Sequence, residues 1–232
     1  MPFTVKHVAG ALLAFIFLLF IPSDTFSQNN AFASADSVRI QLLAMGKPGQ
    51  TIELAREKVL EILETPNACG AWFQDANSNP AGVFATLRFA VDENGPAYIT
   101  ALRTASGGLL FKHPYSGSTV ENAGLNAVIT LNAHGPFFVD SAVLLRQPMI
   151  GSALHRDGWQ NLRIASYLGN TLPARITTLL HELGHVVGRI PDDSDELSGQ
   201  STRNTEQVLH YCRGAIKTSL RHAQISVANG AN

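Results

Sequence analysis

The sequence is poor in charged residues and carries no excess of either sign. Only 15% of its 232 residues are charged, and 17 basic residues balance 18 acidic ones to give a net charge of -1. Nucleic-acid-binding domains normally show a basic excess or a basic stripe, so this composition argues against a nucleic-acid partner. We also find no internal repeat and no regular glycine or proline period, which excludes collagen-like, coiled-coil and solenoid folds.

Long hydrophobic runs are equally scarce, because only residues 9–21 form one. As a helix, about thirteen residues rise only about 20 Å, which is less than the roughly 30 Å hydrocarbon core of a bilayer. The run follows Lys6 and precedes several small residues, a pattern typical of a signal peptide. We therefore expect residues 1–33 to be removed and the mature protein to be secreted or periplasmic, without a membrane anchor. An uncleaved anchor is the alternative.

Cysteine is limited to Cys69 and Cys212. An even pair in an oxidising compartment favours a disulfide. A bond that closes so long a loop is expected to stabilise the fold by about 4–5 kcal/mol in the chain-entropy model. The alternatives are a buried thiol, or a cysteine that caps a metal ion in a latent precursor.

Helical periodicity occurs near both ends of the mature chain. Apolar residues recur at spacings of three and four over residues 51–64, 171–187 and 201–216, which predicts three helices. The segment 36–45 is mixed and could be a strand. The length of the chain suggests one domain, which we place at residues 36–218 and follow with a flexible tail at 219–232.

The middle of the chain changes to short apolar runs separated by turn-forming residues. Such runs, rich in β-branched and aromatic residues, predict strands of a largely antiparallel sheet. The predicted strands cover residues 83–91, 97–104, 109–111, 126–131, 137–139 and 142–145. Together with the terminal helices, they predict an α+β fold.

A possible metal-binding motif lies in the helix predicted over residues 171–187. His181 and His185 are four residues apart, so their imidazoles project from the same face and can bind one cation. Zinc accepts neutral imidazole nitrogens, and catalytic zinc sites keep one position for water. Glu182 follows His181 and is placed to accept a proton from that water.

These residues resemble the motif of the zincin metallopeptidases, and Gly188 extends the likeness to the metzincin and snapalysin-like pattern. The resemblance implies a third zinc ligand after a sharp turn, but the expected position holds Pro191, which cannot bind a metal. A slightly longer turn would supply Asp192 or Asp193 instead. No methionine follows Met149, so the methionine turn of the metzincins is absent. The resemblance covers only the active helix and its exit loop.

A thermolysin-like arrangement is the alternative source of the third ligand. In that group a glutamate on the next helix binds the zinc, about twenty residues after the second histidine. Glu206 lies 21 residues after His185 and close to Asn204, although the rest of the family's pattern is missing. Asp192 or Asp193 is the preferred third ligand, and Glu206 is the less favoured one.

The resemblance further implies a zincin-like α+β fold, in which a mostly antiparallel sheet packs on the active helix. An edge strand of that sheet would pair with an extended peptide, and residues 126–131 or 142–145 are suitable. Five aromatic or histidine side chains are candidates to stabilise the oxyanion formed during hydrolysis, although a structural role is favoured for each. They are His134, His155, Tyr167, His210 and Tyr211.

The sequence therefore predicts a secreted zinc metallopeptidase, most simply an endopeptidase acting on peptides or proteins. Glu182 is expected to act as the general base and to pass the proton to the leaving amine. One alternative is a non-catalytic zinc-binding or structural domain with a degenerate protease site, which the displaced third ligand would favour. A second alternative is a zinc hydrolase with a substrate other than a peptide.

Overall fold

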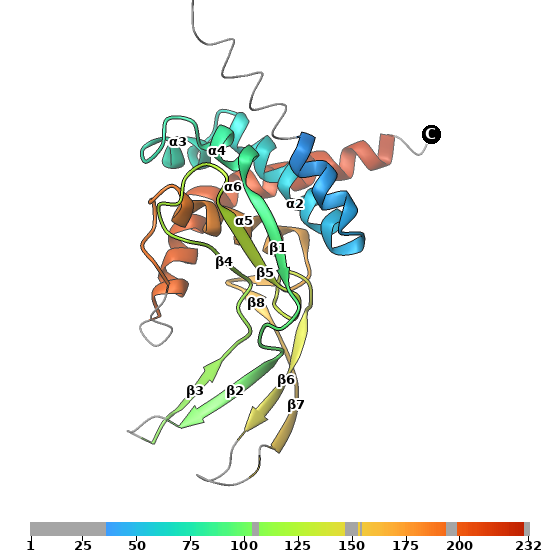
Figure 1. Ribbon diagram of the computed structural model, residues 1–232, viewed down its shortest axis with the longest axis vertical. Coiled ribbons are helices and arrows are strands. Elements are labelled where there is room, and N and C mark those ends of the chain that lie inside the picture. The colour runs from blue at the N-terminus through green and yellow to red at the C-terminus, as the bar shows by residue number, and fades with distance from the viewer. Residues whose placement is uncertain (1–35, 104–106, 147–152, 154, 194–198, 230–232) are drawn as a thin grey trace, which may run out of the picture.

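The computed structural model describes residues 36–103, 107–146, 153, 155–193 and 199–229. The predicted signal peptide at residues 1–33 lies outside these ranges. Within them, no helix combines the length and the hydropathy needed to cross a bilayer. The fold is α+β, as predicted, with helices at both ends of the described chain and mixed sheets between them (Figure 1).

Helices form the body of the molecule. Residues 36–44 are helical, and the labelled helices are α2 (Lys47–Glu64), α3 (Ala68–Gln74), α4 (Pro80–Thr86), α5 (Leu172–Val186) and α6 (Gln200–Asn229). Local sequence explains where the short helices begin. The side chain of Asn67 accepts hydrogen bonds from the first amides of α3, and Asn79 caps α4 just before Pro80. Both are residue types preferred at these positions.

Three small sheets complete the fold. The first has the order β1-β5-β4, in which β1 (Arg88–Asp92) pairs in parallel with β5 (Val128–Asn132), and β4 (Gly117–Ser118) pairs antiparallel with β5. The second sheet projects away from the helical body (Figure 1) and has the order β3-β2-β6-β7. Its strands are β2 (Tyr98–Arg103), β3 (Leu109–Lys112), β6 (Ser141–Arg146) and β7 (His155–Asn161), with β2 and β6 parallel. A two-stranded ribbon joins β8 (Arg163–Ile164) to β9 (Tyr167–Leu168).

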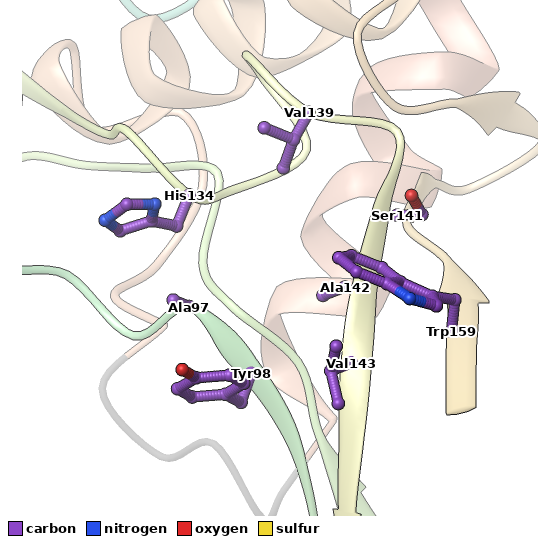
Figure 2. A pocket seen from close by; sticks show the side chains of 8 residues that line it. All are labelled: Ala97, Tyr98, His134, Val139, Ser141, Ala142, Val143 and Trp159. Carbon is purple, nitrogen blue, oxygen red and sulfur yellow. The ribbon is translucent and has the colours of Figure 1, made fainter. Parts of the chain in front are cut away.

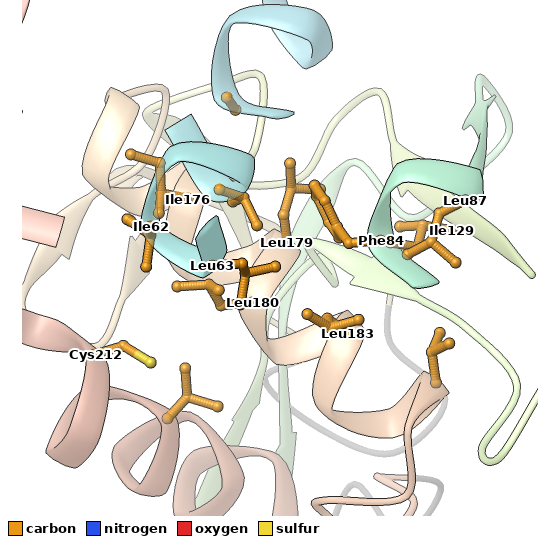
Figure 3. Close-up of a cluster of buried hydrophobic side chains, with 14 of the residues drawn as sticks. Ile62, Leu63, Phe84, Leu87, Ile129, Ile176, Leu179, Leu180, Leu183 and Cys212 are labelled. Atoms are coloured by element: carbon orange, nitrogen blue, oxygen red, sulfur yellow. The ribbon is translucent and has the colours of Figure 1, made fainter. Parts of the chain in front are cut away.

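The main hydrophobic core lies between α5, the other helices and the first sheet (Figure 3). Leu179, Leu180 and Leu183 on α5 are fully buried in it, together with Ile129 and Leu131 on β5. Each fully buried leucine contributes about 1.5–3 kcal/mol to the stability of the fold. The backbone of α5 is therefore anchored on its apolar side, which fixes the direction in which its polar side faces.

The predicted disulfide is present, because Cys69 and Cys212 are bonded across 143 residues. The bond joins α3 to α6. From the sequence, Cys69 was expected just after the helix predicted over residues 51–64. The short helix α3, which contains Cys69, was not predicted. Trp72 on α3 stacks on Tyr211, the residue before Cys212, with ring centroids 5.1 Å apart, so the two helices are joined by packing as well as by the covalent bond.

Several predicted elements differ from the structure. Residues 36–44 form a helix instead of a strand, because Val38 and Leu42 are buried on one face while Ile40 is exposed. The predicted strand 83–91 begins as the end of α4 and becomes β1 only at Arg88. Residues 137–139 form a turn, and the buried ring of Phe137 explains its apolar character.

The predicted helices 51–64, 171–187 and 201–216 are confirmed, with changed ends. Helix α2 begins earlier, at Lys47, because Pro48 is well placed in the first helical turn. Helix α6 continues to Asn229, through most of the segment predicted to be a tail. Ser219 is buried in this part of α6, which shows that at least its beginning packs against the body of the protein.

Candidate metal centre

Helix α5 places the two histidines of the motif on one face. Pro173 lies in its first turn, and the helix ends with the C-cap at Val187. His181 and His185 are both buried, and their Nε2 atoms lie 3.0 Å apart. Since the opposite side of the helix is held by the leucines of the core, the imidazoles can converge without any movement of the backbone.

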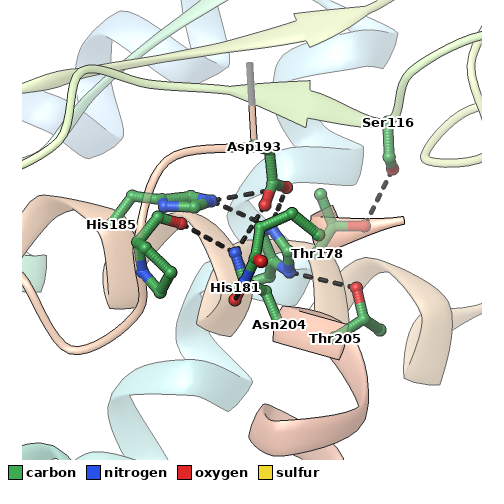
Figure 4. Close-up of polar contacts among 9 residues, drawn as sticks. Ser116, Thr178, His181, His185, Asp193, Asn204 and Thr205 are labelled. Carbon is green, nitrogen blue, oxygen red and sulfur yellow. Dashed lines mark hydrogen bonds and ion pairs between the residues drawn. The ribbon is translucent and has the colours of Figure 1, made fainter. Parts of the chain in front are cut away.

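A carboxylate joins the two imidazoles (Figure 4). Asp193 Oδ2 lies 2.8 Å from His181 Nε2 and 3.5 Å from His185 Nε2. One donor atom from each of the three side chains therefore lies within 4.8 Å of the others. Two imidazole nitrogens and a carboxylate oxygen are thus brought together as a group that could bind a metal ion. We call His181, His185 and Asp193 the metal group.

The spacing of these three atoms fits a tetrahedral cation. Zinc binds imidazole nitrogen at about 2.0–2.1 Å, so two ligand atoms at neighbouring corners of a tetrahedron lie about 3.3 Å apart. The separations of 2.8, 3.0 and 3.5 Å bracket that value. Side-chain shifts of a few tenths of an ångström would therefore suffice to admit the ion.

A tight turn after α5 brings Asp193 back to the histidines. Gly188 adopts a left-handed conformation, with φ of 67°, as is common after a helix C-cap. The carbonyl of Gly184 then accepts a hydrogen bond of 2.7 Å from the amide of Arg189. Ile190 packs so closely on Gly184 that a Cβ atom there would lie 2.8 Å from its Cδ1 atom. The two glycines of the motif therefore allow the chain to reverse within a few residues.

The three candidates for the third ligand lie in different surroundings. Asp193 joins the histidines, whereas Asp192 is exposed and lies outside the group. Glu206 is also exposed, on α6, and does not belong to the group among the residues that the structure describes. The turn is longer than the metzincin pattern by two positions, because Pro191 lies where that pattern has its ligand and Asp193 supplies the carboxylate.

Two side chains of α6 form hydrogen bonds with Asp193 and His181 (Figure 4). The amide of Asn204 donates to Asp193 Oδ1 at 2.5 Å and to the carbonyl of Pro191 at 2.7 Å. Thr205 Oγ1 lies 3.1 Å from His181 Nδ1. Such outer contacts orient metal ligands and fix the tautomer of a histidine. The sequence marks Asn204 only as a neighbour of Glu206 and gives no role to Thr205, because no local pattern links these residues to α5.

Glu182 is buried beside the histidines, with only 4% of its surface exposed. Its Oε2 atom has no hydrogen-bond partner. Burial raises the pKa of Glu182, although the charges of His181 and His185 oppose this effect. A carboxylate with a raised pKa is suited to exchange protons near neutral pH.

Hydrogen bonds and charges within the group shift the pKa values of Asp193 and His185. Burial acts to raise the pKa of Asp193, yet hydrogen bonds from His181 and His185 lower it well below its usual range. Burial likewise acts to lower the pKa of His185, but the hydrogen bond to Asp193 and the charge of Glu182 outweigh it, so that this pKa is raised. Asp193 is therefore held in the ionised form, which is the form that a cation would also require.

Strand β4, which the sequence did not predict, contacts α5 and lies beside Glu182. The candidates at residues 126–131 and 142–145 correspond to β5 and β6, and both are central strands with neighbours on each side. Their apolar composition reflects burial. Strand β4 lies at the edge of its sheet, and Ser116 just before it forms a 2.8 Å hydrogen bond with Thr178 of α5.

The three histidines among the five candidates for oxyanion stabilisation do not belong to the metal group in the described part of the chain. Within the described part of the chain, the group consists of His181, His185 and Asp193 alone. His134 instead borders a shallow pocket of about 270 Å³ on the projecting sheet, between Tyr98 and Trp159 (Figure 2). The other candidates lie on β7, β9 and α6, and they are His155, Tyr167, His210 and Tyr211.

Comparisons with protein-family models, curated proteins and solved structures find no match to this chain. The likeness to the zincins therefore remains local. The structure shows, in addition, that two buried histidines and one half-buried aspartate form a group that could hold a metal ion.

Proposed function

We propose that this protein is an extracytoplasmic zinc metallopeptidase, with His181, His185 and Asp193 as the metal ligands and Glu182 as the general base. The observation that carries the proposal is the arrangement of these four side chains. Three donor atoms converge within 4.8 Å, and the carboxylate next to them has a buried oxygen without a hydrogen-bond partner. Three protein ligands leave one position open, as in catalytic zinc sites.

The donor set alone is compatible with more than one metal. Two histidines and one carboxylate bind zinc in hydrolases, but the same set binds iron(II) in oxygenases. The presence of Glu182 favours a hydrolase, because hydrolysis requires a base that accepts a proton from the attacking water. A bound zinc ion would polarise the scissile carbonyl and make a water molecule more acidic.

Each side chain then has a defined role in the proposed reaction. Glu182 accepts the proton of the attacking water and delivers it to the nitrogen of the leaving amine. Asn204 and Thr205 hold Asp193 and His181 in place through the hydrogen bonds described above. The leucines on the far side of α5 anchor this helix in the hydrophobic core.

Backbone pairing at β4 is the proposed mode of substrate binding. This strand has one neighbour, β5, and its other edge lacks a paired strand within the described structure. An extended polypeptide can add to such an edge through main-chain hydrogen bonds with little dependence on its side chains. We therefore propose unstructured proteins or peptides as substrates. The disulfide supports an oxidising, extracytoplasmic location.

The replacement of Glu182 by Gln tests the proposal. We expect Glu182→Gln to bind one zinc ion per chain like the wild type, and to lose at least a thousandfold in the rate of cleavage of an unfolded protein such as reduced casein. His185→Ala should lose the metal itself, which serves as the matched control. Zinc content by elemental analysis and cleavage by gel electrophoresis are the measurements. Full activity in Glu182→Gln would refute the role of this residue.

A non-catalytic zinc-binding domain is the second candidate. It is favoured by the low exposure of the group, since His181, Glu182 and His185 are each at most 6% exposed. The same experiment separates the two functions. A wild-type protein that holds one zinc ion per chain but cleaves neither casein nor a library of unstructured peptides would be a binding domain.

A further inference from the structure

Gly117 on β4 lies directly against the carboxylate of Glu182. A Cβ atom built at this glycine would be 3.0 Å from Glu182 Oε1 and 3.2 Å from both Cδ and Cγ. These are its three nearest heavy atoms, and all of them belong to Glu182. Any side chain at this position would therefore meet the proposed general base first.

The backbone conformation of Gly117 does not itself require a glycine. Its φ angle is not in the left-handed region, unlike those of Gly188 and five other glycines of the described chain. It pairs with Leu131 of β5 in regular antiparallel register. Strand positions of this kind normally favour β-branched or aromatic residues, so the proximity of Glu182 is what disfavours a side chain here.

The strand and the helix that carry the two sides of this contact are linked to each other. Ser116, the residue before Gly117, is joined to Thr178 of α5 by the 2.8 Å hydrogen bond. Thr178 Oγ1 also donates to the carbonyl of Ala174 one turn earlier. This link fixes the distance between β4 and α5 on the side that carries Glu182.

We infer that Gly117 is a positioning residue for Glu182, because its missing side chain creates the space in which the carboxylate lies between β4 and the two imidazoles. A larger residue at position 117 would push the carboxylate away from this place without touching the metal ligands. The inference rests on the proposed function for its kinetic consequence. The contact itself does not depend on that function.

The contact is tested in the metal-free protein by a double-mutant cycle. Gly117→Val should lower the urea midpoint of unfolding in the wild type, because the new side chain collides with the Glu182 carboxylate. In the Glu182→Ala background the collision is gone, so Gly117→Val should leave the midpoint unchanged or raise it. Ser118→Val, one residue further along the same strand, is the control and should shift the midpoint equally in both backgrounds.

The kinetic arm uses the zinc-loaded protein. We expect Gly117→Val to lower kcat for peptide cleavage at least tenfold, with zinc affinity unchanged and KM altered much less. Glu182→Asp shortens the side chain by one methylene, so the penalty of Gly117→Val should be several-fold smaller in that background. Gly214→Ala on α6, where a Cβ atom meets nothing within 4 Å, is the control and should retain activity.

The outcomes separate this inference from the proposed function. Equal effects of Gly117→Val in the presence and absence of the Glu182 side chain, on the urea midpoint, would overturn the inference even if the wild type cleaves peptides. An inactive wild type would refute the peptidase function, and the metal-free cycle would still decide whether Gly117 positions Glu182.

Discussion

At the scale of single residues, two hydrogen bonds set the position of the segment around β4 near the candidate site. Tyr115, just before β4, donates a 2.5 Å hydrogen bond to Asp92 Oδ2 at the end of β1. The bond joins the segment before β4 to the end of β1. Asn132 contributes a second link there, because its backbone amide donates to the carbonyl of Ser116. The position of β4 is thus set by specific hydrogen bonds in addition to its short ladder.

The hydrogen bond of Tyr115 predicts a change of stability at alkaline pH. Burial, together with the bond to Asp92, raises the pKa of Tyr115 to about 12, compared with about 10 in an unfolded chain. The stabilisation from this neutral phenol is therefore complete below pH 10 and is lost as the pH rises through 12. Unfolding free energies of the wild type and Tyr115→Phe should differ at pH 8 and converge near pH 12.

Absorbance near 295 nm provides the matching titration, because it reports ionised tyrosine. Among the four tyrosines of the chain, the step assigned to Tyr115 should be absent in Tyr115→Phe. A difference in stability between the two proteins that stays constant up to pH 12 would contradict this assignment.

Residue-scale patterns were also the most informative part of the sequence. The spacing of His181 and His185 identified the metal group because helical geometry determines where two residues four apart must point. The choice between Asp192 and Asp193 could not be made in this way. It depends on the reversal after Gly188 and on the hydrogen bond from Asn204, which are contacts between distant segments.

At the scale of elements, the metal group depends on the packing of α6 against the exit turn of α5. Asn204 holds both Asp193 and the backbone of Pro191. On the other side of the turn, Arg189 bonds to Asp75 at 3.2 Å and lies 4.9 Å above the ring of Trp72 on α3. Two separate helices therefore restrain the segment that carries Asp193.

The loss of the Asn204 side chain should weaken metal binding. Without its amide, Asp193 loses the hydrogen bond that orients its carboxylate, and removal of such supports typically costs 10–100-fold in metal affinity. We expect a weakening of this size for Asn204→Ala in a competition titration with a chromophoric zinc chelator. Glu206→Ala, at an exposed position of the same helix, should bind zinc like the wild type. Equal affinity of Asn204→Ala and the wild type would refute the supporting role.

Some elements could be predicted from the sequence and others could not. Helices α2 and α5 were predictable because each buries a stripe of residues at helical spacing, such as Ile52, Val59 and Leu183. Strand β4 consists of Gly117 and Ser118 only, which is too short to show alternation. Its existence follows from pairing with β5 and from the bond between Ser116 and Thr178, and neither can be inferred from local composition.

At the scale of the whole molecule, the described strands form three separate sheets, of which the first packs on α5, the second projects away from the helices and the third is the β8-β9 ribbon (Figure 1). The sequence predicted strands in this region but combined them into one largely antiparallel sheet. The parallel pairs β1–β5 and β2–β6 connect segments that are far apart in the chain. Such pairing leaves no mark on local periodicity, so only the α+β class could be predicted.

The disulfide should make a large contribution to the stability of the whole fold. It closes a loop of 143 residues, for which the chain-entropy model gives about 5 kcal/mol. Replacement of both Cys69 and Cys212 by Ala should lower the unfolding free energy by about that amount in urea titrations. Treatment of the wild type with a reducing agent should produce a similar loss. A change below about 1 kcal/mol in both measurements would contradict the prediction.

We propose that His181, His185 and Asp193 bind one zinc ion. X-ray absorption at the zinc edge, on protein loaded with one equivalent of the metal, tests this most directly. We predict a first shell of two imidazole nitrogens and one or two oxygens at about 2.0–2.2 Å, which changes when Asp193 is replaced by Ala. A shell that contains sulfur, or a spectrum that is the same after Asp193→Ala, would contradict the claim.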